Sequence, residues 1–247
     1  MYFLSFETST KIFSLAVNKD EKVLRYRNLK TASVLEDSIL PTLDKLLDSA
    51  GIKFSQVDGF AIALGPGSFT SLRVGLSTIK AFAMSTAKPV VGIPTMDIIA
   101  HAIQDMSFPN ASIGNPFNHY DEICVINDAR RGKVYACLYG LKDARLSRKS
   151  EYLLASLEDV LEKVHGKTLF VGDGLVLYRQ SIEEAYQKYA AKKGSTCKCF
   201  FADEKWWYPQ AKVMAGLAYE RFRSEKYDDA AALQPLYLYP QDCQVTR

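Results

Sequence analysis

The 247-residue sequence has little excess charge of either sign. It holds 31 lysines and arginines against 28 aspartates and glutamates, which gives a formal net charge of +3. A domain that grips nucleic acid by itself is usually much more basic. If RNA is involved, most of the binding free energy must therefore come from elsewhere.

Closely spaced pairs of histidines or cysteines, which could bind a metal ion, are also lacking. There are three histidines, His101, His119 and His165, and no two of them are close enough to share one turn of a helix. A site built on paired histidines therefore cannot form locally. The cysteines, at positions 124, 137, 197, 199 and 243, include no Cys-x-x-Cys pair. Scattered free thiols favour a reducing compartment, and we expect no metal site in this chain.

Targeting signals are not evident. Residues 1–7 contain no basic leader, and Glu7 comes too early for a signal peptide. No apolar run approaches the length of about 18 residues that spans a membrane. We therefore expect a cytoplasmic protein that does not contact a membrane.

The hydrophobic content, 48%, is that of a globular protein. In the first part of the chain, alternation and helical spacing of apolar residues predict three strands followed by helix, strand, helix, strand and helix. The predicted strands are residues 2–6, 12–17, 22–27, 57–64 and 90–93, and the predicted helices are 35–50, 69–86 and 95–104.

The same order recurs after a loop rich in Asn, Pro and Gly at residues 107–120. Strands are predicted at 123–126, 134–139, 152–154, 169–171 and 198–201, and helices at 157–164, 175–190 and 210–224. This order predicts an α/β protein with two ribonuclease-H-like lobes. We expect a first lobe at residues 1–106 and a second at 121–247, with helix 210–224 free to pack back on the first lobe.

The strongest local motif is the glycine-rich turn of residues 64–75, Leu-Gly-Pro-Gly-Ser-Phe-Thr-Ser-Leu-Arg-Val-Gly. A turn between a strand and a helix can hold an anion on backbone N–H groups, although glycines there also allow close packing. Such a contact contributes roughly 0.3–1 kcal/mol, far below the roughly 8 kcal/mol of micromolar binding. A vestigial anion or nucleotide loop would comprise Glu7, Thr8, Ser9, Gly65, Gly67 and Ser68.

The predicted helix Phe69–Thr86 has two sides that can pack. One side, which includes Leu72, Leu76 and Ile79, can cover the sheet, and a second side carries small or β-branched residues. Helix Leu35–Ala50 is the expected neighbour, and internal packing of both sides is the alternative to a partner surface. The candidate partner residues are Leu35, Ile39, Leu43, Leu46, Ser71, Val74, Thr78 and Ala81.

These segments resemble the TsaB (YeaZ) family, the dimerisation subunit of the bacterial tRNA threonylcarbamoyladenosine machinery. The resemblance rests on residues 3–10, 39–52, 64–76, 89–95, 128–135, 171–174 and 234–238. It implies a duplicated actin-like (sugar kinase/heat-shock ATPase) fold without a working active site. It also implies pairing with the paralogous transferase TsaD, which acts on adenosine 37 of tRNA, and recruitment of the ATPase TsaE by that pair.

On this resemblance, ATP and metal are expected on the partner subunits and no cofactor in the isolated chain. Contact with tRNA is expected to be indirect or minor, and pairing of the free chain with itself stays open. The chain departs from the family at three places. Glu7 stands where the family usually has an aspartate, and Tyr239 stands where an arginine is common. Before the first helix, where the family often has a histidine, this chain has Thr31-Ala32-Ser33.

Two enzyme alternatives remain, a small-molecule kinase of the same architecture and a metal-dependent peptidase. A kinase needs a phosphate turn in each lobe, and only the first lobe has a plausible one. A peptidase of this kind needs paired histidines. No catalytic set is evident, so we expect a non-catalytic subunit.

Overall fold

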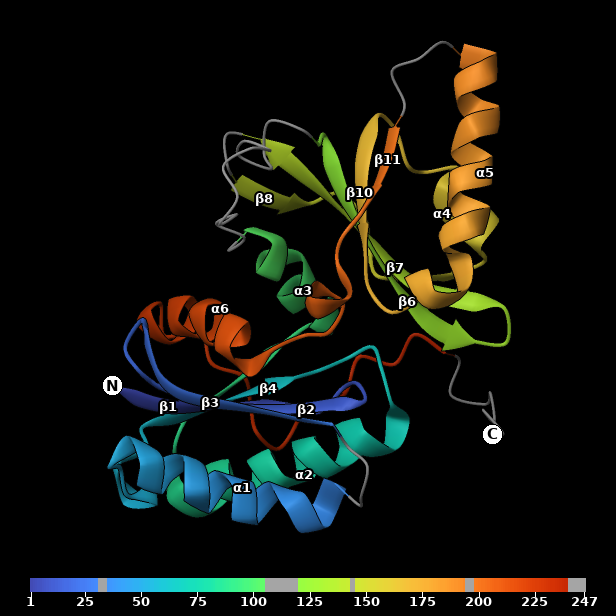
Figure 1. Cartoon of the computed structure of the whole chain (residues 1–247). Helices are drawn as coiled ribbons and strands as arrows, with labels where there is room; N and C mark the ends of the chain where they lie inside the picture. Colours follow the sequence, from blue (N-terminus) through green and yellow to red (C-terminus); the bar gives the residue numbers. More distant parts are fainter. Residues whose placement is uncertain (31–34, 105–119, 143–144, 194–197, 240–247) are drawn as a thin grey trace. The chain divides into compact units, whose positions relative to one another are not determined.

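The computed structural model describes residues 1–30, 35–104, 120–142, 145–193 and 198–239 (Figure 1). The chain divides into two units, Met1–Ile98 with Pro209–Tyr237, and Ile99–Tyr208 with Leu238–Arg247. The predicted connecting loop lies outside the described residues except for Tyr120. The division differs from the expected ranges because residues 209–237 belong to the first unit.

Unit 1 contains a five-stranded sheet in the order β3-β2-β1-β4-β5. The first three strands form an antiparallel meander, and β4 and β5 run parallel to β1 and to each other. This is the ribonuclease-H-like arrangement that the element order predicts. Its elements are β1 Tyr2–Glu7, β2 Ile12–Lys19, β3 Lys22–Lys30, α1 Leu35–Ala50, β4 Gly59–Ala63, α2 Phe69–Thr86, β5 Val90–Ile93 and α6 Ala211–Arg223.

Side chains alternate between the two faces of this sheet, so each face has its own cover. Leu4 and Phe6 of β1 belong to the core formed with α1 and α2. Phe3, on the opposite face, packs against Phe222 of α6 with ring centroids 5.1 Å apart. Figure 1 shows α1 and α2 on one side of the sheet and α6 on the other. The helix predicted at 210–224 thus covers the first sheet.

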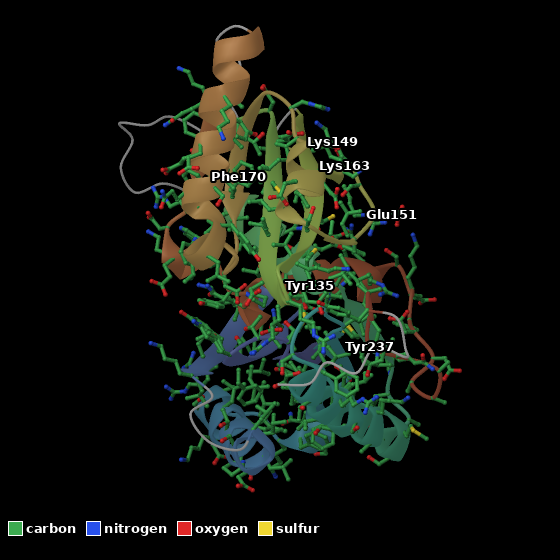
Figure 2. The ribbon with its side chains drawn as sticks, turned by 90° about the vertical axis from the view of Figure 1, so that its right-hand side faces the viewer. Tyr135, Lys149, Glu151, Lys163, Phe170 and Tyr237 are labelled. Atoms are coloured by element: carbon green, nitrogen blue, oxygen red, sulfur yellow. The ribbon has the colours of Figure 1, made fainter. Side chains whose placement is uncertain are left out.

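Unit 2 repeats the same strand order, β8-β7-β6-β10-β11, and β9 also pairs with β7. Helix α3, Thr95–Gln104, contains the unit boundary at Ile98 and Ile99. Phe170 of β10, labelled in Figure 2, belongs to the core of this unit. Its ring packs edge to face against that of Tyr186 of α5, with ring centroids 5.8 Å apart. The elements are β6 Glu122–Arg130, β7 Lys133–Lys142, β8 Arg145–Arg148, β9 Leu153–Ala155, α4 Leu157–Leu161, β10 Lys167–Val171, α5 Leu175–Lys193 and β11 Lys198–Phe201.

The strand predicted at residues 152–154 is present as β9, Leu153–Ala155, which pairs with the start of β7. The sequence argument missed β8, which pairs with the end of β7 and is the third strand of the unit. Strand β8 reads Arg-Leu-Ser-Arg, and such a short polar run carries almost no strand signal.

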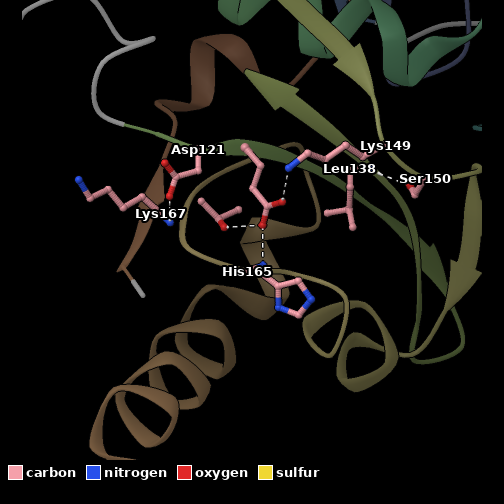
Figure 3. Close-up of polar contacts among 8 residues, drawn as sticks. Asp121, Leu138, Lys149, Ser150, His165 and Lys167 are labelled. Atoms are coloured by element: carbon pink, nitrogen blue, oxygen red, sulfur yellow. Dashed lines mark hydrogen bonds and ion pairs between the residues drawn. The ribbon is translucent and has the colours of Figure 1, made fainter. Parts of the chain in front are cut away.

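A buried carboxylate ties β6 to β10 in unit 2. Glu122 Oε1 accepts hydrogen bonds from the His165 N–H at 2.6 Å and from the Thr168 hydroxyl at 3.0 Å. Glu122 Oε2 forms an ion pair with Lys149 at 3.3 Å. Figure 3 shows these contacts beside the hydrogen bond from the Lys167 N–H to Asp121. Burial of this carboxylate is therefore compensated by three donors.

Within the described residues, no helix has both the length and the apolar character needed to cross a membrane.

Candidate functional site

The candidate partner residues on α1 do not lie at the surface. Leu35, Ile39, Leu43 and Leu46 are all buried in the core of unit 1, where α1 packs on the sheet. Apolar residues at helical spacing mark the side of α1 that packs on the sheet, because that is the side buried in the core. Their assignment to a partner surface is therefore corrected.

Among the described side chains of α1, Leu40 is a large apolar residue that is exposed, at 54% of its maximal area. At about 100° per residue it lies beside Leu47 and roughly opposite Ser49. The Ser49 carbonyl accepts a hydrogen bond from Arg25 of β3. Leu40 is thus on the flank of α1 away from β3. In the sequence, Leu40 is a leucine outside the set that recurs at helical spacing, so the periodicity argument did not select it.

The four candidate residues on α2 differ in their exposure to solvent. Ala81 is exposed, Ser71 and Thr78 are half-buried, and Val74 is half-buried against the core of unit 1. Met84, which the periodicity argument also missed, is 63% exposed one turn after Ala81. The open side of α2 therefore carries small residues and one flexible apolar side chain. We call Leu40, Ser77, Ala81 and Met84 the α1–α2 surface.

The glycine turn packs against the turn between β1 and β2. The Ser68 N–H donates to the Ser9 carbonyl at 2.7 Å, and a Cβ added at Gly67 would overlap that same oxygen. Ser68 is the N-cap residue of α2, although its side chain makes no capping hydrogen bond. A Cβ added at Gly75 would overlap the Thr8 hydroxyl. The structure thus brings all the turn candidates together, and their glycines serve close packing.

Glu7 lies at the end of β1, fully buried. Its Oε1 accepts hydrogen bonds from the Ser9 N–H at 2.7 Å and from the Ser9 hydroxyl, while Oε2 is buried without a hydrogen-bond partner among the described residues. Burial raises the pKa of Glu7 from 4.5 to about 8, and the two Ser9 hydrogen bonds oppose that rise only in part. A carboxyl group with this pKa is mostly protonated at neutral pH.

The second glycine turn, Gly172 to Gly174, is used structurally in unit 2. The Asp173 carboxylate accepts a hydrogen bond from the Asp128 N–H at 3.1 Å, and the Gly174 N–H donates to the Ile126 carbonyl at 3.1 Å. A Cβ on Gly172 would overlap the Ile126 carbonyl oxygen. Asp173 thus holds β6 near its end.

No group of three or more His, Cys, Asp or Glu residues in the described parts of the chain could hold a metal ion. His101 lies in α3 and His165 in the exposed turn before β10, whereas His119 lies outside the described residues. Large apolar side chains are exposed on the α1–α2 surface, where Leu40 and Met84 lie, and also at the start of α5 in unit 2, where Val176 and Leu177 lie.

The chain is similar to known proteins of one group. The family model of the tRNA N6-adenosine threonylcarbamoyltransferase TsaD matches residues 30–241. The tRNA threonylcarbamoyladenosine biosynthesis protein TsaB of Bacillus subtilis is 26% identical over 188 residues, 74% of this chain and 76% of the relative. TsaB of Escherichia coli is 22% identical over 242 residues, 96% of this chain and 94% of the relative.

The fold has a solved counterpart. YeaZ from Pseudomonas aeruginosa superimposes with a TM-score of 0.71 at 20% identity, over 96% of this chain and 99% of that one. The fold and the family model together define a two-unit ribonuclease-H-like protein that shares the TsaD domain. Within that class, the chain belongs to the TsaB (YeaZ) family.

Proposed function

We propose that this chain is a non-catalytic, cytoplasmic subunit that binds and activates a TsaD-like transferase in the threonylcarbamoylation of tRNA adenosine 37. The curated relatives are named for this biosynthesis, and the family model is that of the transferase itself. We further propose that the chain holds neither nucleotide nor metal, which the partner subunits would supply. A TsaE-like ATPase would join the pair, and tRNA would be held mainly by the partner.

One observation carries the proposal, the α1–α2 surface. Leu40 of α1 and Met84 of α2 are more than half exposed in unit 1, and a partner helix that covered them would remove this apolar surface from water. Ser77 and Ala81, small exposed residues two turns and one turn before Met84 on α2, would allow a helix of the partner to approach to about 8–10 Å. A TsaD-like chain of related fold offers such helices.

Replacing Ala81 by Arg tests this surface. Ala81 is exposed, so the variant should keep its fold, while an interface of about 1,200–2,000 Å² would have to bury the new charge. We expect the affinity for the TsaD-like partner to fall at least about a hundredfold, which corresponds to about 3 kcal/mol. Sedimentation with and without the partner measures it, alongside circular dichroism and melting temperature.

Two further variants make the result interpretable. Ser181→Arg places the same charge on an exposed position of α5 in unit 2, and it should assemble normally. Val74→Arg changes a residue packed against the core, so its loss of assembly could reflect unfolding. A folded Ala81→Arg protein with wild-type affinity for the partner would contradict the proposed surface.

A further inference from the structure

Two sequence motifs that lie far apart in the chain form one cluster on the surface of unit 1. Phe69 and Arg73 come from the first turns of α2, and Tyr237 comes from the Gln-Pro-Leu-Tyr-Leu motif near the C-terminus. The Arg73 Nε–H donates to the Tyr237 hydroxyl at 3.0 Å. The Arg73 guanidinium carbon lies 3.7 Å from the Phe69 ring centroid, and the two rings are 5.4 Å apart.

Tyr237 reaches this position through a strap, residues 226–237. The strap begins beside β5, where the Asp228 N–H donates to the Val90 carbonyl at 2.9 Å. Lys80 of α2 then donates to the carbonyls of Ala231 and Leu233 at 2.8 and 3.1 Å. Finally the Leu236 N–H donates to the Leu64 carbonyl at 2.7 Å. Tyr237 is therefore fixed beside α2 (Figure 2).

The cluster leaves the charged end of Arg73 unpaired. Phe69 is 53% exposed and Tyr237 is 38% exposed. Among the described residues the Arg73 Nη groups have no hydrogen-bond or ion-pair partner, since its recorded polar contact is through Nε. Helix α2 contains no acidic residue that could pair with Arg73. The guanidinium is thus held in place by two aromatic rings, with two Nη groups available.

A planar guanidinium with free Nη groups matches a carboxylate, which it can bind through two parallel hydrogen bonds. A phosphate backbone fits less well, because RNA binding draws on several cations. The other cation of α2, Lys80, is already used by the strap. Arginine and tyrosine are also the residue types that dominate binding energy at protein interfaces.

We propose that Arg73, held by Phe69 and Tyr237, binds an aspartate or glutamate side chain of the TsaD-like partner. This inference rests on the proposed function, and it extends the α1–α2 surface to the first turns of α2. It gives the strap a role in recognition, because the strap supplies the tyrosine that orients the arginine.

The test compares Arg73→Gln, Arg73→Lys and Tyr237→Phe for their affinity to the partner. We expect Arg73→Gln to raise Kd about 10- to 100-fold, as loss of a hydrogen-bonded charge pair does. Arg73→Lys should restore only part of the affinity because lysine cannot bind a carboxylate through two fixed donors. Tyr237→Phe keeps the ring and should raise Kd less than Arg73→Gln does. Arg27→Gln, at an exposed position of β3, is the matched control and should leave Kd unchanged.

Salt dependence separates recognition from a purely structural role. Wild-type affinity should fall with added salt more steeply than that of Arg73→Gln, because only the wild type has the ion pair to be screened. Equal salt slopes, or wild-type affinity in folded Arg73→Gln, would overturn the inference. Loss of tRNA binding with unchanged partner affinity would also overturn it, in favour of an RNA contact. If Ala81→Arg still assembles while Arg73→Gln does not, the proposed α1–α2 surface fails and the arginine contact stands.

Discussion

Replacing Glu7 by Gln should make the stability of the protein less dependent on pH. Glu7 is fully buried, and burial raises its pKa to about 8 from an ordinary value of 4.5. Between pH 4.5 and about pH 8, Glu7 therefore keeps its proton in the folded state but has lost it in the unfolded state. The free energy of unfolding must then fall as the pH rises through this window and level off above it.

The size of the effect follows from the two pKa values. They differ by 8 − 4.5 = 3.5, and each unit corresponds to 1.36 kcal/mol, so the whole effect is at most about 5 kcal/mol. Between about pH 5 and pH 7 the same linkage gives a fall of about 2.5 kcal/mol. Glutamine has the same shape and can still accept both Ser9 hydrogen bonds, but it cannot ionise. The variant should therefore gain stability over the wild type as the pH rises.

Urea unfolding at several pH values, followed by circular dichroism, measures this difference. The gain of Glu7→Gln over the wild type should grow by about 2–3 kcal/mol from pH 5 to pH 7. Glu21→Gln makes the same chemical change at an exposed position, so its difference from the wild type should stay nearly constant. A Glu7→Gln difference that does not change with pH would refute the buried neutral carboxyl group. It would also reopen a charged role for Glu7 at the glycine turn.

Two further pairs of substitutions test the packing at Gly75 and the buried hydrogen bonds of Glu122. Gly75→Ala should lower the free energy of unfolding by about 1–3 kcal/mol, because the new methyl group would overlap the Thr8 hydroxyl. Gly216→Ala in α6, where no atom lies within 4 Å of an added Cβ, should instead stabilise by roughly 0.5–1 kcal/mol. Urea titration distinguishes the two, and equal effects would contradict the close approach. Glu122→Ala should cost about 3 kcal/mol because buried donors lose their acceptor, whereas exposed Glu162→Ala should cost little. A small loss for Glu122→Ala would show that solvent replaces the carboxylate.

The sequence predicts the elements of this fold well because most of them bury one clear apolar side. Helix α1 is an example, since Leu35, Ile39, Leu43 and Leu46 recur at helical spacing and all are buried. The same example shows why the partner surface was placed wrongly. Periodicity reports the side that packs on the sheet, and an external surface has no period of its own.

Contacts between distant segments were beyond the sequence argument. Phe69 and Arg73 were visible as part of a motif, and Tyr237 as part of another, but no spacing rule joins residues 164 positions apart. The strap that joins them has no regular secondary structure over most of its length, so it offers no periodicity to read. In contrast, the turn residues Glu7, Gly67 and Ser68 lie at or after the ends of β1 and β4, and these ends lie at one edge of the sheet because the two strands are parallel neighbours.

The geometry of α2 explains why a turn that resembles a phosphate loop persists in a chain with no evident catalytic set. The inner side of the helix rests on Thr8 at Gly75, and its N-terminus is fixed where the Ser68 N–H meets the Ser9 carbonyl. Both contacts need glycine or a free backbone amide at the turn, and neither needs a ligand. Because α2 also carries Ala81 and Arg73, any shift at the turn would move both proposed contacts with the partner. The glycine turn thus fixes the position of α2 in unit 1.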